Sequence, residues 1–435
     1  MLLRKICLVF SIIVTSTMSA QTLSISSNGQ TGTLGANWSI TGTTLTVTGT
    51  ANIQASVIET ALSSGNLTVV AGDIQVSQDI TSNTTNVLTL KASGTIEIHD
   101  NTGIKTNGGD LILWSNSDNV NGGNVLTGQN VTLDSRQGVA STGGGHIHIA
   151  GGSDSNSDGF PDDATAGIGN FTGGSAYGIL FGNSAGSGVQ LLSGGGNITL
   201  IGGVDGNFNS GANSHGIGFY PGYTVDAGAG SISLTGYGNS GGANTFGIDL
   251  MTFGAQNASS ISTTGDLTLN GVTTVTTNTN YGIIINTGLT VNAGTVDITG
   301  DSDDAGIILN GSVVSNGAIN LKANTYSFSS GSISGQGTVS IEPLTASSSF
   351  SSAFSNSSLT LGSALTGLTI GKSTNTANVT LASSTTIAGP ISIYGGDITI
   401  NENLNTTAGG ANGDILLKGS GNIIQADGKS ITTSG

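Results

Sequence analysis

The chain has 435 residues, of which 72 are glycine, 9 are Lys or Arg and 25 are Asp or Glu, so only 8% are charged. An average domain has about 7% glycine and roughly a quarter charged residues, and so few Lys, Glu and Arg leave little to cover the solvent face of amphipathic helices. Four prolines exclude collagen, 36% hydrophobic residues argue against a disordered chain, and the composition favours β-structure with many turns over helical and α/β enzymes.

Residues 1–20 have the pattern of a secretory signal peptide. Arg4 and Lys5 are followed by an apolar core at 8–14 and a small-residue cleavage site at 18–20. The apolar core is shorter than the roughly 20 residues that span a membrane, and no later stretch is longer. We therefore expect a secreted chain with no transmembrane segment.

Cleavage after residue 20 removes the only cysteine, Cys7, so we expect an exported chain without disulfides. The loss of Arg4 and Lys5 leaves 7 basic residues against 25 acidic ones, a net charge of −18. This charge repels polyanions, which disfavours nucleic acid and anionic membrane surfaces as partners. Divalent cations and neutral glycans are compatible with it.

A three-residue pattern, apolar–polar–apolar, recurs along the chain and predicts short strands with one buried face. These triplets begin at Ile74, Leu88, Ile96, Leu111, Val131, Ile147, Ile198, Ile232, Leu267, Val296, Ile319, Val339, Leu359, Val379, Ile398 and Ile415.

The spacing of the triplets predicts stacked coils. From Ile198 to Ile319 they are widely spaced, and from Val339 to Ile415 they follow one another at shorter and nearly equal intervals, which we interpret as one coil each. Short strands that pair in parallel about 4.8 Å apart and turn at glycine-rich corners would enclose one long core, with glycine supplying positive φ at the corners. The predicted fold class is an all-β parallel β-helix, a β-solenoid of roughly 17 to 20 coils if each takes about 20 to 25 residues.

His146 and His148 alternate with Ile147 and Ile149. If the isoleucines face the core, both imidazoles lie on the outer face of a strand. Two such histidines are within reach of one metal ion, but no third ligand is identifiable, so we favour two surface imidazoles.

An acidic insertion at 150–166 follows and carries the strongest local site pattern, Asp154-Ser155-Asn156-Ser157-Asp158-Gly159-Phe160-Pro161-Asp162-Asp163. Acids or amides at positions 1, 3 and 5, glycine at 6 and an acid at 9 follow the arrangement of an oxygen-only calcium loop. Position 12 is Thr165, where an EF-hand has glutamate. We predict a structural calcium site, against the alternative of a solvated acidic loop, with candidate ligands Asp154, Asn156, Asp158, the carbonyl of Phe160, Asp162 and Asp163.

The middle of the chain repeats a Gly-Ile pair, at Gly178, Gly216, Gly247, Gly282 and Gly306. Preceding residues are mostly aromatic, and His215 holds the position that is aromatic in three of the other repeats. We therefore expect His215 to belong to a stacked ladder rather than to a catalytic site. That ladder would comprise Tyr177, His215, Phe246 and Tyr281.

The predicted solenoid over 21–325 gives way to a Ser- and Phe-rich section at 326–358, interpreted as a decorated coil or a boundary, and resumes at 359–435. Residues 88–108 align without gaps to 415–435, with nine of 21 positions identical, so a second copy of the module is expected to start near residue 396. The second copy stops before the equivalent of the following strand. From this we expect a longer, multi-module protein.

Enzymes built on β-helices, such as polysaccharide lyases and glycosidases, are the main functional alternative. A lyase needs clustered acids and a base, and a glycosidase needs paired carboxylates. The single arginine of the mature chain, Arg136, is expected to pair with Asp134. Aromatic residues that could stack on sugars are mostly expected in the core or the ladder; they are Phe219, Tyr220, Tyr223, Tyr237, Phe246 and Phe253.

The pattern Gly-Asp-Ile…Ile-Leu-Leu-Lys-Gly-Ser-Gly-Asn-Ile at 396–423, with its counterpart at 72–98, resembles bacterial filamentous-haemagglutinin-type surface adhesins and other β-strand-repeat exoproteins. The resemblance implies a right-handed parallel β-helix and a role in attachment to cells, surfaces or biofilm matrix. The chain lacks the Asn-Pro-Asn motif of the two-partner secretion domain.

The sequence thus predicts a non-enzymatic adhesin or structural stalk, secreted or on the surface of a bacterium. Its partners would be glycans or host and abiotic surfaces, held weakly and multivalently. An ice-binding or matrix-structural solenoid is a further alternative, suggested by the threonine-rich stretches 43–50 and 273–279, although these stretches do not recur in the regular ranks that a flat lattice-matching face would need.

Overall fold

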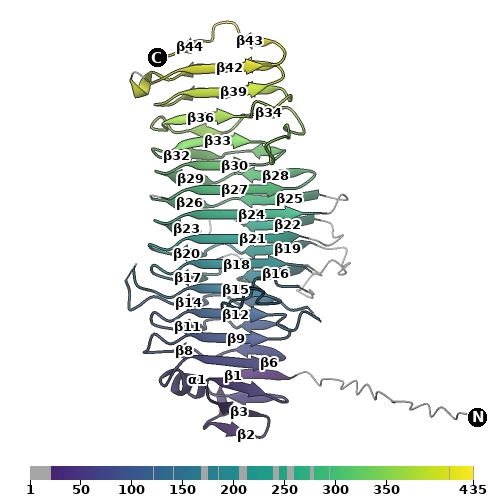
Figure 1. Cartoon of the computed structure of the whole chain (residues 1–435), viewed down its shortest axis with the longest axis vertical. Helices are drawn as coiled ribbons and strands as arrows, with labels where there is room; N and C mark the ends of the chain where they lie inside the picture. The colour runs from purple at the N-terminus through teal and green to yellow at the C-terminus, as the bar shows by residue number, and fades with distance from the viewer. Residues whose placement is uncertain are drawn as a thin grey trace, which may run out of the picture.

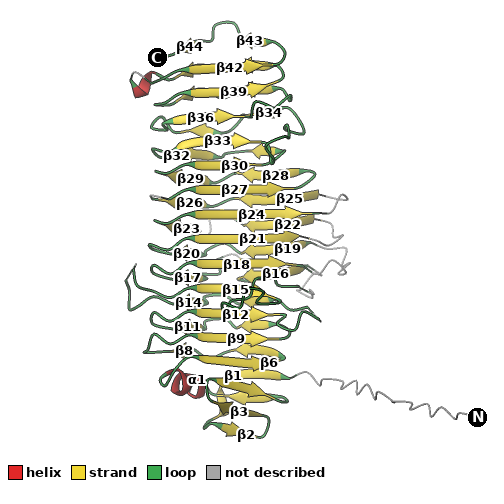
Figure 2. Cartoon of the chain, in the orientation of Figure 1, coloured by secondary structure: helices red, strands yellow, loops and turns green. Residues whose placement is uncertain are grey.

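The computed structural model describes residues 21–434 except 121, 141, 168–174, 185, 205–212, 239–243, 252–258, 275–278, 293 and 411, so the predicted signal peptide at 1–20 lies outside it. The described chain forms a rod of stacked coils (Figure 1). Strands dominate it almost completely (Figure 2). Each coil adds one strand to each of three parallel faces, so the predicted fold class, an all-β parallel β-helix, is confirmed.

Sheet 1 is the longest sheet and runs nearly the whole length of the rod. Its neighbouring strands are parallel except where β3 pairs with β2 and with β4. In spatial order it contains β2 (Leu34–Gly35), β3 (Trp38–Thr41), β4 (Thr44–Val47), β6 (Leu67–Ala71), β9 (Leu88–Ala92), β12 (Leu111–Ser115), β15 (Ile147–Gly151), β18 (Ile198–Gly203), β21 (Ile232–Gly238), β24 (Leu267–Thr273), β27 (Val296–Asp301), β30 (Ile319–Lys322), β33 (Thr338–Glu342), β36 (Gly367–Ile370), β39 (Ile391–Gly395) and β42 (Ile415–Gly419).

Sheet 2 follows sheet 1 along each coil. It contains β5 (Ala51–Ile53), β1 (Thr22–Gln30), β7 (Asp73–Val76), β10 (Ile96–Ile98), β13 (Val125–Thr127), β16 (Ala176–Phe181), β19 (Ser214–Phe219), β22 (Asn244–Leu250), β25 (Thr279–Ile285), β28 (Ala305–Leu309) and β31 (Tyr326–Phe328). Further along the chain its place is taken by a separate sheet of β34 (Phe354–Ser355), β37 (Val379–Leu381), β40 (Ile398–Ile400) and β43 (Ile423–Gln425).

Sheet 3 completes each coil. It contains β8 (Ile80–Thr81), β11 (Gly103–Lys105), β14 (Thr132–Asp134), β17 (Gln190–Leu192), β20 (Thr224–Asp226), β23 (Ser260–Thr263), β26 (Gly288–Val291), β29 (Ser312–Ser315), β32 (Ser332–Ser334) and β35 (Thr360–Leu361). A separate sheet of β38 (Thr385–Thr386), β41 (Leu404–Asn405) and β44 (Ile431–Thr432) succeeds it.

The described strands from β6 to β44 make thirteen consecutive three-strand coils, so the expectation of 17 to 20 coils was wrong. The reason is that corners and insertions lengthen many coils. Ile147 and Ile198, for example, are register partners on neighbouring strands, although the whole acidic insertion lies between them in the sequence. At about 4.8 Å per coil this stack is about 60 Å long.

The wide spacings in the middle of the chain do correspond to single coils, because Ile198, Ile232, Leu267, Val296 and Ile319 are register partners on sheet 1.

The short spacings near the C-terminus do not correspond to single coils. Val379 lies on β37, which is on a different face of the rod from β33 and β42, the sheet 1 strands of Val339 and Ile415. On sheet 1 the register partner of Val339 is Leu368, which is followed by Ile391 and then by Ile415. One coil is therefore longer than the interval between neighbouring triplets in this part of the chain.

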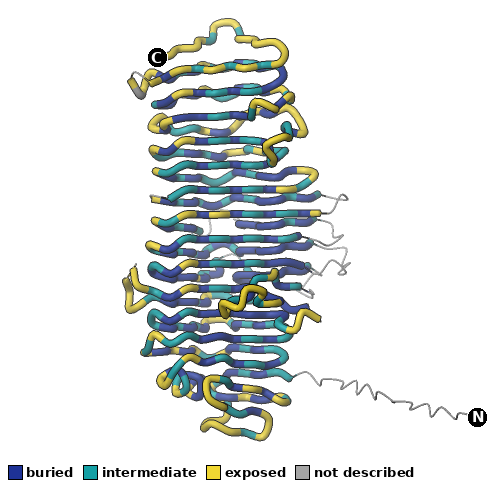
Figure 3. Tube along the Cα trace, viewed as in Figure 1, coloured by how far each residue is buried: buried dark blue, intermediate teal, exposed yellow. Residues whose placement is uncertain are grey.

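One continuous apolar core fills the rod from Leu23 to Leu404. In most triplets the apolar residues point inward and the polar one outward, as in β21, where Ile232 and Leu234 are buried and Ser233 is half-buried. The alternation is visible along the coils (Figure 3). Stacking is what buries these three-residue faces, since each alone is too small to form a core.

Close backbone approach, more than positive φ, explains several of the glycines. A Cβ on Gly271 would lie 2.1 Å from the carbonyl oxygen of Gly282, where sheets 1 and 2 meet. At the corner before sheet 1, a Cβ on Gly196 would lie 2.0 Å from the oxygen of Gly145. Neither of these glycines has positive φ, whereas Gly194 and Gly195, at the same corner as Gly196, do have the positive φ predicted for corner glycines.

The N-terminal end of the rod is closed by structure that the sequence did not predict. Helix α1 (Ala55–Leu62) buries Val57, Ile58 and Leu62 against the core, and the β2–β3–β4 meander is antiparallel. A short 3-10 helix, η1 (Thr407–Gly409), lies near the other end. None of the helices in the described ranges is long and apolar enough to cross a membrane.

Residues 326–358 form a boundary on one face of the rod. Sheet 2 ends at β31 and a separate sheet begins at β34, whereas sheet 1 continues from β33 to β36 and sheet 3 from β32 to β35. Phe350 and Phe354 enter the core here and stack with ring centroids 5.3 Å apart. Tyr326 packs edge-on against both rings.

The duplicated segments fold alike. Leu90 and Leu417 lie on sheet 1, in β9 and β42, and the aspartates that precede these coils make equivalent contacts. Oδ1 of Asp73 accepts the Thr95 N–H at 2.8 Å, and Oδ1 of Asp397 accepts the Asn422 N–H at 2.7 Å. Thr95 and Asn422 are aligned positions of the two segments.

Candidate functional site

The acidic insertion follows β15 and packs on the outer face of sheet 1. The Gly151 N–H donates to the Asp163 carbonyl at 2.9 Å, which closes the loop at its base. Nε1 of Trp114, on the adjacent strand β12, donates to the Gly152 carbonyl at 2.8 Å. The ring of Phe160 lies against His148, with centroids 5.0 Å apart. The loop is therefore anchored at both its base and its tip.

Within the loop, one turn holds three of the predicted calcium ligands. The two carboxylate oxygens of Asp154 accept the N–H groups of Asp158 and Gly159, at 3.1 and 3.0 Å. Oδ1 of Asn156 accepts the Asp158 N–H at 2.9 Å, and Oδ1 of Asp158 accepts the Phe160 N–H at 2.9 Å. Asp154, Asn156, Asp158 and the backbone of Phe160 are thus arranged around a single turn.

The other two predicted ligands are engaged by serines. Oδ2 of Asp162 accepts both the hydroxyl and the N–H of Ser155 at 2.7 Å, and these hydrogen bonds lower the pKa of Asp162. Oδ2 of Asp163 accepts the hydroxyl of Ser153 at 2.6 Å and its N–H at 2.9 Å.

Calcium takes 6 to 8 oxygen ligands, and within the described residues no three His, Cys, Asp or Glu side chains form a metal-binding group. Calcium binding stays a prediction, and Asp154, Asn156 and Asp158 are the side chains that one turn already holds together.

His146 and His148 have different surroundings. Ile147 and Ile149 are fully buried in the core, as expected, and both imidazoles are on the outer side. Nε2 of His148 donates to the Pro161 carbonyl at 2.8 Å, and burial under the loop lowers the pKa of His148. Nδ1 of His146 accepts the Asn197 N–H at 2.9 Å. The pair therefore supports the loop and the next coil rather than sharing a ligand.

A contact between Lys91 and Trp114 was not predicted from the sequence. Nζ of Lys91 lies 3.5 Å from the centre of the Trp114 ring, within cation–π distance. Burial lowers the pKa of Lys91, and the nearby Asp154 opposes that shift. The two residues are register partners on β9 and β12, so only the pairing of the strands could have revealed the contact.

The predicted aromatic ladder is confirmed on sheet 2. His215 stacks between Tyr177 and Phe246, with both centroid distances 4.5 Å and interplanar angles of 15° and 13°. Phe246 continues to Tyr281 at 5.5 Å. Tyr177 packs with Leu180 and Met251 in a small apolar cluster apart from the main core, so the ladder lies on the outer side of the sheet.

Asp249 lies beside the ladder, next to His215. Its Oδ2 lies 3.3 Å from Nδ1 of His215, and both residues are more than nine-tenths buried. Within the described chain neither ring nitrogen of His215 makes a hydrogen bond of good geometry, so the imidazole and the carboxyl group are close but not well aligned. Burial raises the pKa of the neighbouring Tyr177 well above its usual range.

The remaining candidates have structural explanations. Arg136 makes the expected bidentate pair with Asp134, at 2.9 and 2.8 Å. Phe219 and Tyr223 are fully buried in the core. Tyr220 and Tyr237 are half-buried, and Phe253 lies outside the described residues.

Two rows of mostly small polar residues run along the rod, and the sequence did not identify which residues form them. The hydroxyl row of sheet 3 has Ser or Thr at six of eight register positions, with an amide at Gln190 and no side chain at Gly288. In order, its positions are Thr132, Gln190, Thr224, Ser260, Gly288, Ser312, Ser332 and Thr360. The polar row of sheet 1 consists of Thr199, Ser233, Thr268, Asp297, Asn320, Ser340, Thr369 and Ser392.

The spacing of both rows is set by the strands, at about 4.8 Å per coil. The hydroxyls of Thr224, Ser260 and Ser312 make no hydrogen bond within the part of the chain that the structure describes, so they are available to a ligand.

No protein-family model, curated protein or solved structure matches this chain.

Proposed function

We propose that the chain is a non-enzymatic rod of a secreted or cell-surface attachment protein, which binds neutral glycans or similar hydroxyl-rich surfaces through many weak contacts. The observation that carries the proposal is the hydroxyl row of sheet 3. It presents uncharged donors and acceptors at a fixed spacing along an inflexible scaffold.

The scaffold contributes rigidity. Each coil is held to the next by parallel ladders on three faces, and one apolar core joins all of them. A rigid row loses less conformational freedom on binding than a flexible one, so individually weak hydrogen bonds add up. Each further contact is effectively intramolecular once the first has formed, which raises the overall affinity without a strong single site.

The experiment is adhesion of purified protein to immobilised neutral polysaccharides and to biofilm matrix. The double variant Ser260→Glu/Ser312→Glu places two carboxylates in the hydroxyl row of sheet 3. We expect it to reduce adhesion at least about tenfold, because each charge must be desolvated against a neutral surface. The control Ser233→Glu/Thr268→Glu adds the same charge to the polar row of sheet 1. Equal adhesion of wild type and the sheet 3 variant would contradict the proposal.

An assay on pectin, alginate and similar polymers tests the enzyme alternative. Turnover that is lost in Asp249→Asn would overturn the non-enzymatic proposal, since Asp249 and His215 are a buried acid–base pair.

A second candidate, binding to a crystalline lattice such as ice, is favoured by the same rows. Their regular spacing is what lattice matching requires, and it comes from residues other than the threonine-rich stretches at 43–50 and 273–279. Thermal hysteresis that disappears in Ser260→Glu/Ser312→Glu would support this candidate over glycan attachment.

We further propose that calcium orders the acidic insertion. Asp154, Asn156 and Asp158 would supply side-chain oxygens and Phe160 a carbonyl. Their contribution would be structural, since the loop is anchored to sheet 1 through Trp114 and His148.

A further inference from the structure

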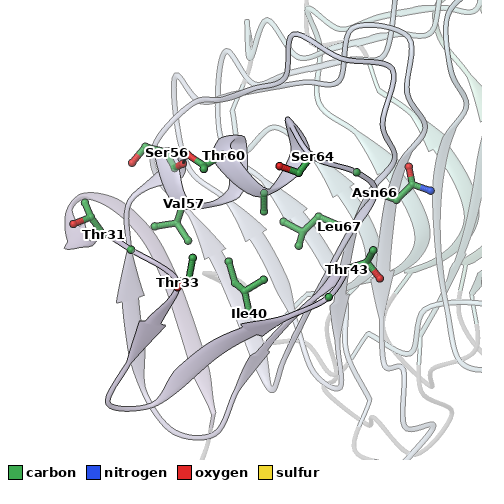
Figure 4. A pocket seen from close by; sticks show the side chains of 14 residues that line it. Thr31, Thr33, Ile40, Thr43, Ser56, Val57, Thr60, Ser64, Asn66 and Leu67 are labelled. Atoms are coloured by element: carbon green, nitrogen blue, oxygen red, sulfur yellow. Dashed lines mark hydrogen bonds between the residues drawn. The ribbon is translucent and has the colours of Figure 1, made fainter.

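The N-terminal end of the rod contains a pocket of about 430 Å³ between helix α1 and the β3–β4 hairpin (Figure 4). Its apolar floor comes from three elements: Ile40 on β3, Val57 and Ala61 on α1, and Leu67 at the start of β6. Pockets that bind small molecules span roughly 300 to 1,000 Å³ and are mostly apolar with a few polar groups, so this one has the size and make-up of a ligand site.

The rim is polar and carries hydroxyl groups on several sides (Figure 4). Thr31 and Thr33 line one side, Thr43 lies near the hairpin turn, and the helix adds further hydroxyls. The rim side chains are Thr31, Thr33, Thr43, Ser56, Thr60, Ser64 and Asn66. Among the described residues, no Asp, Glu, Lys, Arg or His lines the pocket, so a charged ligand would find no countercharge there.

Several of these rim groups are not used by the fold. The hydroxyls of Thr31, Thr33, Thr43 and Ser64 make no hydrogen bond to the part of the chain that the structure describes. By contrast, the Thr60 hydroxyl donates to the Ser56 carbonyl at 2.6 Å and belongs to the helix. Four unused hydroxyls around an aliphatic floor are an arrangement that a ligand can satisfy without disturbing any internal contact.

We propose that this pocket binds a neutral sugar, a mono- or disaccharide end of a glycan. A sugar ring has an aliphatic C–H face, which would cover Ile40 and Ala61, the half-buried residues of the floor, and hydroxyls around its edge, which would bond to the rim. The choice of a sugar over other neutral ligands rests on the proposed attachment function. The site itself differs from the hydroxyl rows, because it encloses a single ring at the end of the rod instead of contacting a flat surface.

The test is saturation-transfer NMR and calorimetry of the full chain with a panel of neutral mono- and disaccharides. Binding is expected with a Kd on the order of 1 mM for a single ring. Ala61→Leu fills the floor and should weaken binding at least about tenfold. Thr33→Val removes one unused hydroxyl, leaves the helix intact and should weaken binding several-fold. Thr46→Ala, an exposed change on β4 away from the pocket, is the matched control and should bind like wild type.

Failure of the pocket and failure of the proposed function are distinguishable. Sugar binding that Ala61→Leu and Thr33→Val both leave unchanged, or no binding to any neutral sugar in the panel, would refute the pocket assignment. If these variants adhere to polysaccharide like wild type while Ser260→Glu/Ser312→Glu does not, attachment stands without the pocket. If free sugars bind the pocket but the rod does not adhere, the pocket stands without the attachment function.

Discussion

Nδ1 of His215 lies 3.3 Å from Oδ2 of Asp249, inside an aromatic stack on the outer side of sheet 2. The residues are on adjacent strands, β19 and β22, and the register neighbours of Asp249 are Gly218 and Ile284. The imidazole is an ionisable partner for the buried Asp249 carboxyl group, and removing one member of such a pair is costly if the other is left buried and charged.

The first prediction is that the two residues are energetically coupled. His215→Phe keeps a ring in the ladder but isolates Asp249, and breaking a buried pair costs about 3–5 kcal/mol. The double variant His215→Phe/Asp249→Leu removes the charge as well and should recover much of that loss.

Chemical denaturation of wild type, both single variants and the double variant measures the coupling. Single-variant effects that add to the double-variant effect within about 0.5 kcal/mol would show that the pair is independent.

The second prediction concerns calcium. Added Ca²⁺ should raise the melting temperature of wild type, because binding to the folded loop alone stabilises it by mass action. Asp158→Ala should abolish this increase, whereas Asp303→Ala, outside the acidic insertion, should keep it. Differential scanning calorimetry with Ca²⁺, Mg²⁺ or chelator measures the effect. A melting temperature that does not respond to Ca²⁺ would remove the calcium site.

The third prediction is a pH dependence of the acidic insertion. Burial under the docked loop lowers the pKa of His148 below its ordinary 6.5, so the imidazole binds a proton more readily when the loop is undocked. Docking is therefore fully stable above about pH 6.5 and weakens as the pH falls below it. The pKa of His148 from NMR and the rate of proteolysis within the loop measure this.

In that experiment His148→Phe is the control, since it keeps a ring against Phe160 but cannot titrate. Proteolysis that accelerates equally at low pH in wild type and in His148→Phe would assign the effect to another group.

The fourth prediction tests the glycines. Gly271→Ala should destabilise the rod by roughly 1–3 kcal/mol or more, since its Cβ would lie 2.1 Å from the Gly282 carbonyl oxygen and two backbones must separate. Gly288→Ala, on β26, meets only the Ser312 hydroxyl at 3.4 Å and should be neutral or slightly stabilising. Thermal melting of the two variants compares them directly; equal melting temperatures would exclude close approach as the reason for Gly271.

Local patterns were sufficient for the features that depend on neighbours in sequence. The alternation of Ile147, His148 and Ile149 predicted which side chains face the core, because successive side chains of a strand point to opposite sides. The Gly-Ile repeat predicted that His215 stacks in the ladder, because parallel strands in register bring equivalent residues of successive repeats together. The Arg136–Asp134 pair and the single turn of Asp154, Asn156 and Asp158 could also be predicted, because their members lie close together in the sequence.

Other features depended on how the coils stack, and only the tertiary structure decided them. The number of residues between two triplets does not show whether they lie on the same face of the rod. The nearly equal spacings near the C-terminus were therefore interpreted as one coil each, although Val339 and Val379 lie on different faces. The contact of Lys91 with Trp114, the pair of His215 with Asp249 and the hydroxyl row of sheet 3 join residues that are far apart in sequence and lie on successive coils. The sequence by itself determined a glycine-rich parallel solenoid with inward-facing triplets. Which outward side chains meet was decided by the register between strands of successive coils. The register in turn depends on the length of each corner, which the sequence pattern does not reveal.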